Sequence, residues 1–207
     1  MKERGMIFNG AMVRAILDGR KAQTRRPVKF PHIDKDAICE LSGNELAGEL
    51  SAGNYRNSRH GKPGDRLWVR ETWAEAGAGA PDLKLYRANY PDHVPSHYEN
   101  VPPEKDVRWK PSIHMPRWAS RITLEITNVG VQRLQSISQN DAAREGLIKL
   151  PATGRYCLNH GDQYFGGASH DAREVYSWLW ESIYGEGSWQ ANPWVWVIEF
   201  KRIEDKS

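Results

Sequence analysis

The sequence predicts an α+β fold in which a closed or nearly closed sheet leaves a cleft lined by helix ends. Alternating large apolar residues mark strands in the segments 121–137 and 194–203, and apolar residues recur at helical spacing in at least three other segments. The 207 residues suit one β-rich domain with insertions, and no repeat or coiled coil interrupts them. We therefore expect a single domain over residues 1–207.

The first expected helix lies directly before the densest basic segment of the chain. Asn9 is a good N-cap, and Gly19 occupies the place of a helix C-terminal glycine. The apolar face between them consists of Met12, Val13, Ile16 and Leu17. This pattern predicts an amphipathic helix between Asn9 and Gly19.

The segment after this helix carries candidate chemistry. Lys21 and Thr24 lie three residues apart, so one turn of bent backbone would aim an amine and a hydroxyl at the same point. The guanidinium groups of Arg25 and Arg26 lie alongside and suit an anion or a carbonyl-rich base. The alternative is a solvated charge run that interacts with the negative end of the helix dipole.

Two further helices are expected in the second half of the chain. In the first, Ser138 is the N-cap, Asp141 its capping partner and Gly146 the terminating glycine, which leaves Glu145 at the helix end. The second begins after the N-cap Asp171, and its tryptophans are expected in the core.

Three segments between these elements have the composition of insertions. Residues 31–63 are polar and glycine-rich, so we expect mostly a loop or short hairpin, whose length suggests a lid. Residues 74–110 are irregular apart from a short strand at 83–88, and residues 148–170 are a glycine-rich loop.

A GxKxxxxR pattern, formed by Gly19, Lys21 and Arg26, resembles the signature of the ASCH domain family. Three later segments match the family in order: GDRLWVRETW at 64–73, the helix that ends in Glu145, and the strand at 194–203. The resemblance implies a PUA-like β-barrel with flanking helices and long loop insertions. The length of the chain and its IHMPRW segment are similar to those of phage and prophage members.

Within this family, the chain resembles the small bacterial N4-acetylcytidine amidohydrolases, whose lysine, threonine and later glutamate match Lys21, Thr24 and Glu145. The resemblance implies an amidohydrolase without cofactor that removes the acyl group from N4-acylated cytosine nucleosides or related modified bases. The alternative is a non-catalytic module, because PUA-like barrels also bind RNA or modified bases through the same cleft.

Two chemical schemes fit these three catalytic candidates. In the first, neutral Lys21 takes the proton of Thr24, which attacks the acyl carbon, while Glu145 handles the proton at the leaving amine. This scheme needs a strongly lowered lysine pKa, through burial or through Arg25 and Arg26. In the second, Glu145 activates water, and cationic Lys21 with the Thr24 hydroxyl stabilises the oxyanion.

Aromatic and basic residues elsewhere are candidates for substrate binding. Trp68, Trp73 and Trp118 lie in strand or loop contexts where a side chain can stack on a nucleobase, although the core is the competing interpretation for each. Arg117 lies in the proline-stiffened segment 109–121, which suits either a recognition loop or a crossover strapped over the sheet.

Strand alternation places either Arg70 or Glu71 on an apolar face, where a charge needs a partner. Both are therefore also candidates for substrate binding. The ion pairs that we expect are Arg70 with Glu145 or Glu71 with Lys21, and a purely structural ion pair is the alternative.

Composition excludes several classes of protein. The net charge of +3 is too mild to indicate nucleic acid by itself. Cys39 and Cys157 lack metal-ligand spacing, so we expect free thiols and no metal or organic cofactor. Without a long apolar run or a signal-peptide pattern, we expect no membrane association and a cytoplasmic location. The pattern leaves the oligomeric state open.

Overall fold

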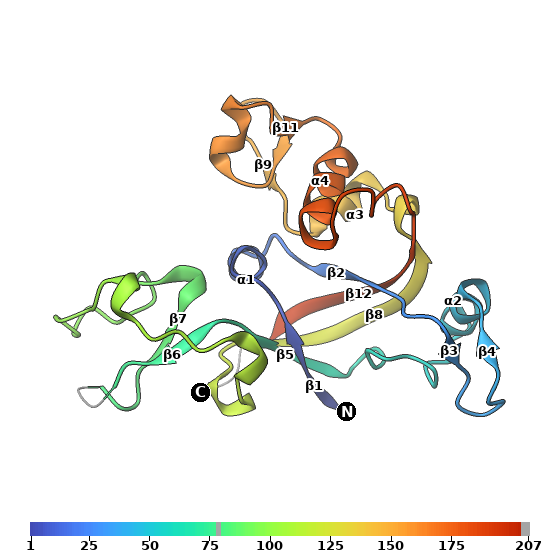
Figure 1. Ribbon diagram of the computed structural model, residues 1–207, viewed down its shortest axis with the longest axis horizontal. Helices are drawn as coiled ribbons and strands as arrows, with labels where there is room; N and C mark the ends of the chain where they lie inside the picture. Colours follow the sequence, from blue (N-terminus) through green and yellow to red (C-terminus); the bar gives the residue numbers. More distant parts are fainter. Residues whose placement is uncertain (78–79, 204–207) are drawn as a thin grey trace.

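The computed structural model describes residues 1–77 and 80–203. Its centre is a mixed five-stranded sheet in the order β1-β5-β8-β12-β2, in which β1 is parallel to β5 and the other neighbours are antiparallel (Figure 1). The strands are β1 (Glu3–Ile7), β5 (Arg66–Arg70), β8 (Thr123–Arg133), β12 (Trp194–Ile203) and β2 (Gln23–Pro27). The predicted α+β class and the strands expected at 64–73, 121–137 and 194–203 are confirmed.

Helices cover both faces of the sheet and bury two apolar clusters. On one face, α1 (Gly10–Leu17) and α2 (Gly43–Ser51) pack against Trp196 and Ile198 of β12. On the other face, α3 (Gln139–Arg144) and α4 (Ala172–Tyr184) pack against Val195 (Figure 1). Strand β12 is apolar on both faces because each of its faces meets helices.

The expected helix ends are confirmed. The Asn9 side chain accepts the Met12 N–H at 2.9 Å at the start of α1, and Gly19 follows the helix with φ +73°. Ser138 caps α3, Glu145 is its C-cap, and Gly146 follows with φ +110°. The α4 helix begins at the N-cap Asp171. Local hydrogen bonding at these caps explains why sequence signals located them.

The sheet does not close into a barrel within the described residues. Strands β1 and β2 are its two edges, and the Arg26 Nη2 of β2 donates to the Ile7 carbonyl of β1 at 2.7 Å across the open seam. A long side chain between the two edges holds their backbones too far apart for a strand ladder. The closed barrel is therefore corrected to an open sheet.

The insertion at 31–63 is mostly exposed, but its Leu41, Leu46 and Leu50 belong to the core. Its hairpin of β3 (His32–Ile33) and β4 (Glu40–Leu41) matches the expectation, but α2 was not predicted. The reciprocal Ser42–Glu45 capping box was a readable signal. Leu46 of α2 is 0% exposed, so burial against the sheet stabilises this helix.

The other two insertions contain small sheets of their own. Strands β6 (Trp73–Glu75) and β7 (Lys84–Tyr86) pair in the first, which confirms the short strand expected near 83–88. Strands β9 (Ile148–Lys149), β10 (Tyr156–Cys157) and β11 (Ala168–Ser169) pair in the second, where we expected only a loop. The 3-10 turns are η1 (Arg87–Asn89), η2 (Glu104–Asp106), η3 (Ser112–His114), η4 (Arg117–Ala119), η5 (Leu134–Ser136) and η6 (His160–Tyr164).

None of the helices in residues 1–77 and 80–203 combines the length and the apolar character that crossing a membrane requires.

Truncation of Leu46 tests whether α2 belongs to the core. Leu46→Ala should lower the free energy of unfolding by about 2–5 kcal/mol, because it opens a cavity at a fully buried site. The control is Ile33→Ala in the same insertion, where the side chain is 44% exposed and the loss should stay below about 1 kcal/mol. Urea unfolding measures both, and equal stability of Leu46→Ala and wild type would show that α2 is a detachable lid.

Candidate functional site

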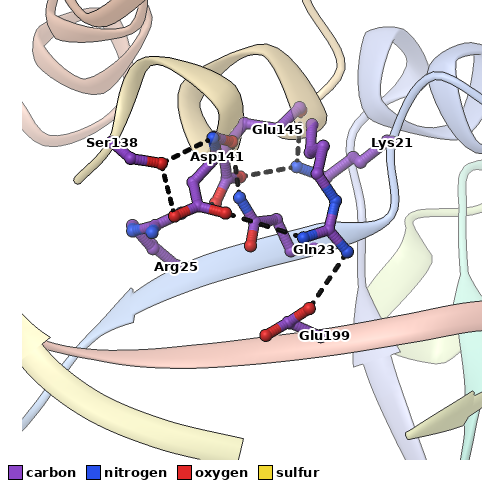
Figure 2. A network of polar contacts seen from close by, with 8 residues as sticks. Lys21, Gln23, Arg25, Ser138, Asp141, Glu145 and Glu199 are labelled. Atoms are coloured by element: carbon purple, nitrogen blue, oxygen red, sulfur yellow. Dashed lines mark hydrogen bonds and ion pairs between the residues drawn. The ribbon is translucent and has the colours of Figure 1, made fainter. Parts of the chain in front are cut away.

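Lys21 and Glu145 meet inside the protein although 124 residues separate them. The chain leaves α1 at Gly19, and Lys21 then forms an isolated antiparallel bridge with Glu145 at the end of α3. The Lys21 Nζ donates to the Glu145 carbonyl oxygen at 2.8 Å and to Oε2 at 2.9 Å (Figure 2). The two side chains are 0% and 3% exposed. The two matched catalytic candidates therefore form a buried ion pair.

Arg25 of β2 completes this ion pair as a second cation. Its Nη1 donates to Glu145 Oε1 at 2.8 Å, and its side chain is 1% exposed. The Arg25 Nε is buried without a hydrogen-bond partner. Both oxygens of the Glu145 carboxylate are thus occupied, while one buried N–H of Arg25 keeps unused donor capacity.

A second layer of polar contacts fixes α3 on the sheet around this cluster. Gln23 of β2 donates to the Asp141 carbonyl, and Asp141 accepts from the Ser138 hydroxyl at 2.7 Å (Figure 2). Arg144 pairs with Glu199 of β12 at 3.0 Å. These contacts position the C-terminal end of α3, and with it Glu145.

Thr24 lies in an extended strand, so the bent turn expected after α1 is wrong. Thr24 pairs with Ile198 and Arg25 with Val197, so strand alternation places the two side chains on opposite faces of β2. Thr24 is 1% exposed. In the described part of the chain, the side-chain hydrogen bonds of Lys21 go to Glu145 and not to the Thr24 hydroxyl.

A small cavity nevertheless has Thr24 and Glu145 together in its lining. Its volume of about 10 Å³ is room for about one water. The cavity lies at the free edge of β2, where side chains from both faces reach it. Its lining consists of Met12, Thr24, Arg25, Glu145, Tyr176, Leu179, Trp180, Ile183 and Tyr184.

Burial lowers the pKa of the Lys21 amine below its ordinary value of 10.5, because the charged form loses its hydration. The Glu145 carboxylate opposes this shift, and the positive charges of Arg26 and Arg25 add to it. The buried cluster holds two cations and one anion, so loss of the Lys21 proton removes its excess positive charge. This direction is the one that the threonine-nucleophile scheme requires.

Tyr176 of α4 is a site residue that the sequence reasoning missed. It is 3% exposed and lines the cavity with Thr24 and Glu145. Burial, reinforced by the Glu145 charge, raises the pKa of its phenol well above the ordinary value, so the group stays neutral. Its place beside Val175 and Leu179 in the expected helix indicated a core position. The sequence therefore gave no reason to expect its phenol group at a polar site.

Two of the predicted substrate-binding residues, Arg26 and Arg70, lie along the seam between β1 and β2, and a third, Trp68, contacts Arg70. Arg26 stacks on Phe8 at 5.5 Å, and Arg70 stacks on Trp68 at 5.4 Å. The expected Arg70–Glu145 pair is wrong, because Arg70 donates instead to the backbone carbonyls of Ser112 and Ile113.

Glu71 also has a different partner from the one expected. It is 2% exposed and accepts two bonds from Arg121, at 2.9 and 3.0 Å, so the Glu71–Lys21 pair is wrong. The two residues lie close together because β5 and β8 are paired: Glu71 directly follows β5, and Arg121 lies just before β8.

The remaining predicted residues belong to the segment 109–121 and its surroundings. Trp73 is 2% exposed and meets Trp118, which is 62% exposed, edge to face at 5.4 Å. Arg117 pairs with Glu3 at 3.1 Å. Met115 is buried against Trp73, so the segment packs as a crossover strapped over the sheet. None of these side chains contacts the Lys21–Glu145 pair in the structure described.

The thiols of Cys39 and Cys157 are free. Across the described ranges, no group of three or more His, Cys, Asp or Glu side chains is placed to hold a metal ion.

Comparison with known proteins finds no match for this chain among family models, curated proteins or solved structures.

The lowered lysine pKa has a measurable consequence for stability. Between the pKa of Lys21 in the folded chain and 10.5, the unfolded chain binds a proton that the folded chain does not. The free energy of unfolding of wild type relative to Lys21→Met should therefore rise with pH, by up to about 1.4 kcal/mol per unit.

Urea unfolding of both proteins between about pH 7 and pH 10 measures this difference. Exposed Lys105 provides the control, because Lys105→Met should show no such trend. If the free energy of unfolding of wild type relative to Lys21→Met falls as pH rises, Glu145 keeps Lys21 protonated and the prediction is wrong.

Proposed function

We propose that this protein is an amidohydrolase that removes the acyl group from N4-acylated cytosine nucleosides or closely related modified bases. Lys21, Thr24 and Glu145 are its catalytic residues, and the reaction needs no cofactor. The proposal combines the resemblance to ASCH amidohydrolases with the geometry of the Lys21 site. We also propose that the open sheet is related to the PUA-like fold.

The observation that carries the proposal is the burial of Lys21 and Glu145 beside unused hydrogen-bonding groups. Desolvation of two charges is costly, so a buried ion pair is weak support for a purely stabilising role. Arg25, whose Nε has no hydrogen-bond partner in the described structure, and Thr24 line the same small cavity. Unsatisfied polar groups and a shifted pKa at one cavity are typical of a reactive site.

Lys21 suits the role of general base for Thr24. A neutral amine has two N–H groups and one lone pair, and the two acceptors on Glu145 account for both N–H groups. The lone pair remains for the Thr24 proton once the two side chains approach. Glu145 suits water activation less well, because each of its carboxylate oxygens already accepts a hydrogen bond, one from Lys21 and one from Arg25.

The chemical steps follow from these roles. The Thr24 oxygen attacks the acyl carbon and its proton passes to Lys21, while the Arg25 Nε–H stabilises the oxyanion. Collapse of this intermediate breaks the bond to the cytosine N4, which takes a proton through Lys21 and Glu145. Water then hydrolyses the threonine ester, releases the carboxylic acid and restores the Thr24 hydroxyl.

The substrate needs more space than the small cavity provides. Glu145 also lines a pocket of about 570 Å³ between α1, the loop after α3, α4 and the insertion at 148–170. This volume lies within the usual range for small-molecule sites. We propose that the nucleoside binds in this pocket and that its acyl group reaches past Glu145 into the small cavity that Glu145 and Thr24 both line.

The second candidate function is a base-binding module without chemistry. The ion pairs favour this function, because Lys21 and Arg25 each have Glu145 as a partner and need no substrate to pair with. Binding of acylated cytidine without product formation is the result that would establish it.

Turnover of N4-acetylcytidine, followed as cytidine release by chromatography, tests the hydrolase. Lys21→Met and Glu145→Gln should each lower the rate by about 10²–10⁴-fold, the usual contribution of a positioned proton-transfer group. Both substitutions keep the side-chain volume. The matched control is Asp65→Asn, which alters another buried, ion-paired carboxylate and should keep the wild-type rate. Absence of turnover by the wild type across a panel of acylated cytidines would refute the proposal.

Substitution of Thr24 separates a nucleophile from a hydrogen-bond donor. Thr24→Val keeps the shape and should fall to the background rate, whereas Thr24→Ser keeps the attacking oxygen and should retain activity. If Thr24 only supports the oxyanion, Thr24→Val should instead cost about 2.7–4 kcal/mol. Mass spectrometry of the quenched reaction should show an acylated Thr24 in the first case alone.

A further inference from the structure

The small cavity that Thr24 and Glu145 line also has two residues with unpaired buried N–H groups in its lining. The guanidinium Nε of Arg25 and the indole Nε1 of Trp180 have no hydrogen-bond partner in the described chain. The Arg25 side chain is 1% exposed and Trp180 is 2% exposed. Both groups donate and cannot accept. Because an unpaired buried donor costs free energy, two of them at one cavity indicate that an acceptor binds there.

The charges beside the cavity call for a negative acceptor. Lys21 and Arg25 share Glu145 as their partner, so the cluster has one excess positive charge while Lys21 is protonated. Glu145 is the only carboxylate among the described residues of the cavity lining. An uncompensated buried charge is costly. Loss of the Lys21 proton removes the excess, and an anion in the cavity offsets it as well.

The size and the remaining lining of the cavity restrict the kind of anion. A volume of about 10 Å³ holds one water-sized particle, which leaves no space for phosphate, sulfate or a carboxylate. Leu179 and Ile183 supply an apolar wall. Tyr176 presents a phenol that burial keeps neutral, because its pKa is raised well above the ordinary value. A neutral phenol can donate to an anion and does not repel it.

We propose that this cavity is a binding site for a small halide ion, held by the N–H groups of Arg25 and Trp180. Chloride is a single atom, accepts hydrogen bonds from several directions and carries the one negative charge that the cluster lacks. A water molecule fills the same space but leaves the positive charge without compensation. The binding needs no substrate, so it stands or falls apart from hydrolysis at Lys21.

A consequence for catalysis rests on the proposed hydrolase function. In that function the Arg25 Nε–H stabilises the oxyanion, and the acyl group enters the cavity that the halide occupies. Chloride should therefore raise the KM for N4-acetylcytidine and leave kcat unchanged, with KM doubled at a chloride concentration equal to its dissociation constant. A protein without turnover would refute the hydrolase and leave the halide site to be decided by binding.

Urea unfolding near neutral pH measures the binding without substrate. Sodium gluconate is replaced stepwise by sodium chloride at constant ionic strength, and gluconate is too large for the cavity. Above the dissociation constant, the folding equilibrium constant of the wild type should rise about tenfold for each tenfold rise in chloride. Equal stability of the wild type in the two salts would overturn the proposal.

Substitution of Trp180 tests the donor. Trp180→Phe keeps an aromatic ring and removes the N–H, so most of the chloride dependence should disappear. The matched control is Trp73→Phe, because Trp73 is also 2% exposed, its Nε1 also lacks a partner, and it lies outside the cavity. This control should keep the dependence of the wild type. An undiminished dependence in Trp180→Phe, or an equal loss in Trp73→Phe, would contradict the assignment.

Bromide locates the ion directly and decides the matter even if Trp180→Phe fails to fold. In wild-type crystals soaked in sodium bromide, an anomalous scattering peak should lie in the cavity, in contact with the Arg25 Nε and the Trp180 Nε1. Bromide peaks elsewhere, with the cavity empty or holding water alone, would overturn the proposal.

Discussion

The arrangement of the helices over the second face of the sheet depends on one carboxylate held between two cations. Glu145 pairs with Lys21 and Arg25, which lie 124 and 120 residues earlier in the chain. Glu145 and Arg25 are both buried, so loss of either leaves the other charge uncompensated, at a cost of about 3–5 kcal/mol. Contacts of Glu145 therefore join the exit of α1, strand β2 and the end of α3. The same contact that holds the fold is also the candidate for chemistry.

The register of β2 divides one basic run between two places. Because side chains alternate along a strand, Arg25 faces Glu145 while Arg26 faces the seam between β1 and β2. A slip of one residue would exchange the faces of Arg25 and Arg26. The pairing of Arg25 with Val197 therefore determines the composition of both the Lys21 site and the seam.

The open seam explains why so many cations gather away from Glu145. Unpaired strand edges invite pairing with other chains, and charged side chains along them oppose it. Arg26 spans the seam to Ile7, and Lys29 and Arg59 flank it. Arg26, Lys29 and Arg59 are therefore charges of the kind that oppose pairing of the edge strands β1 and β2 with other chains.

The sequence by itself determined the local elements of this protein: the ends of α1, α3 and α4, the long strands β8 and β12, and the candidates Lys21, Thr24 and Glu145. Caps and periodicity are properties of neighbouring residues, so a single sequence displays them. The Ser42–Glu45 capping box was a signal for α2, but the polar, glycine-rich composition of residues 31–63 predicted a loop. Only the tertiary structure decided that Glu71 pairs with Arg121, that Tyr176 closes the cavity beside Thr24, and that β1 and β2 stay apart. These outcomes depend on contacts between residues far apart in the chain, which no local pattern encodes.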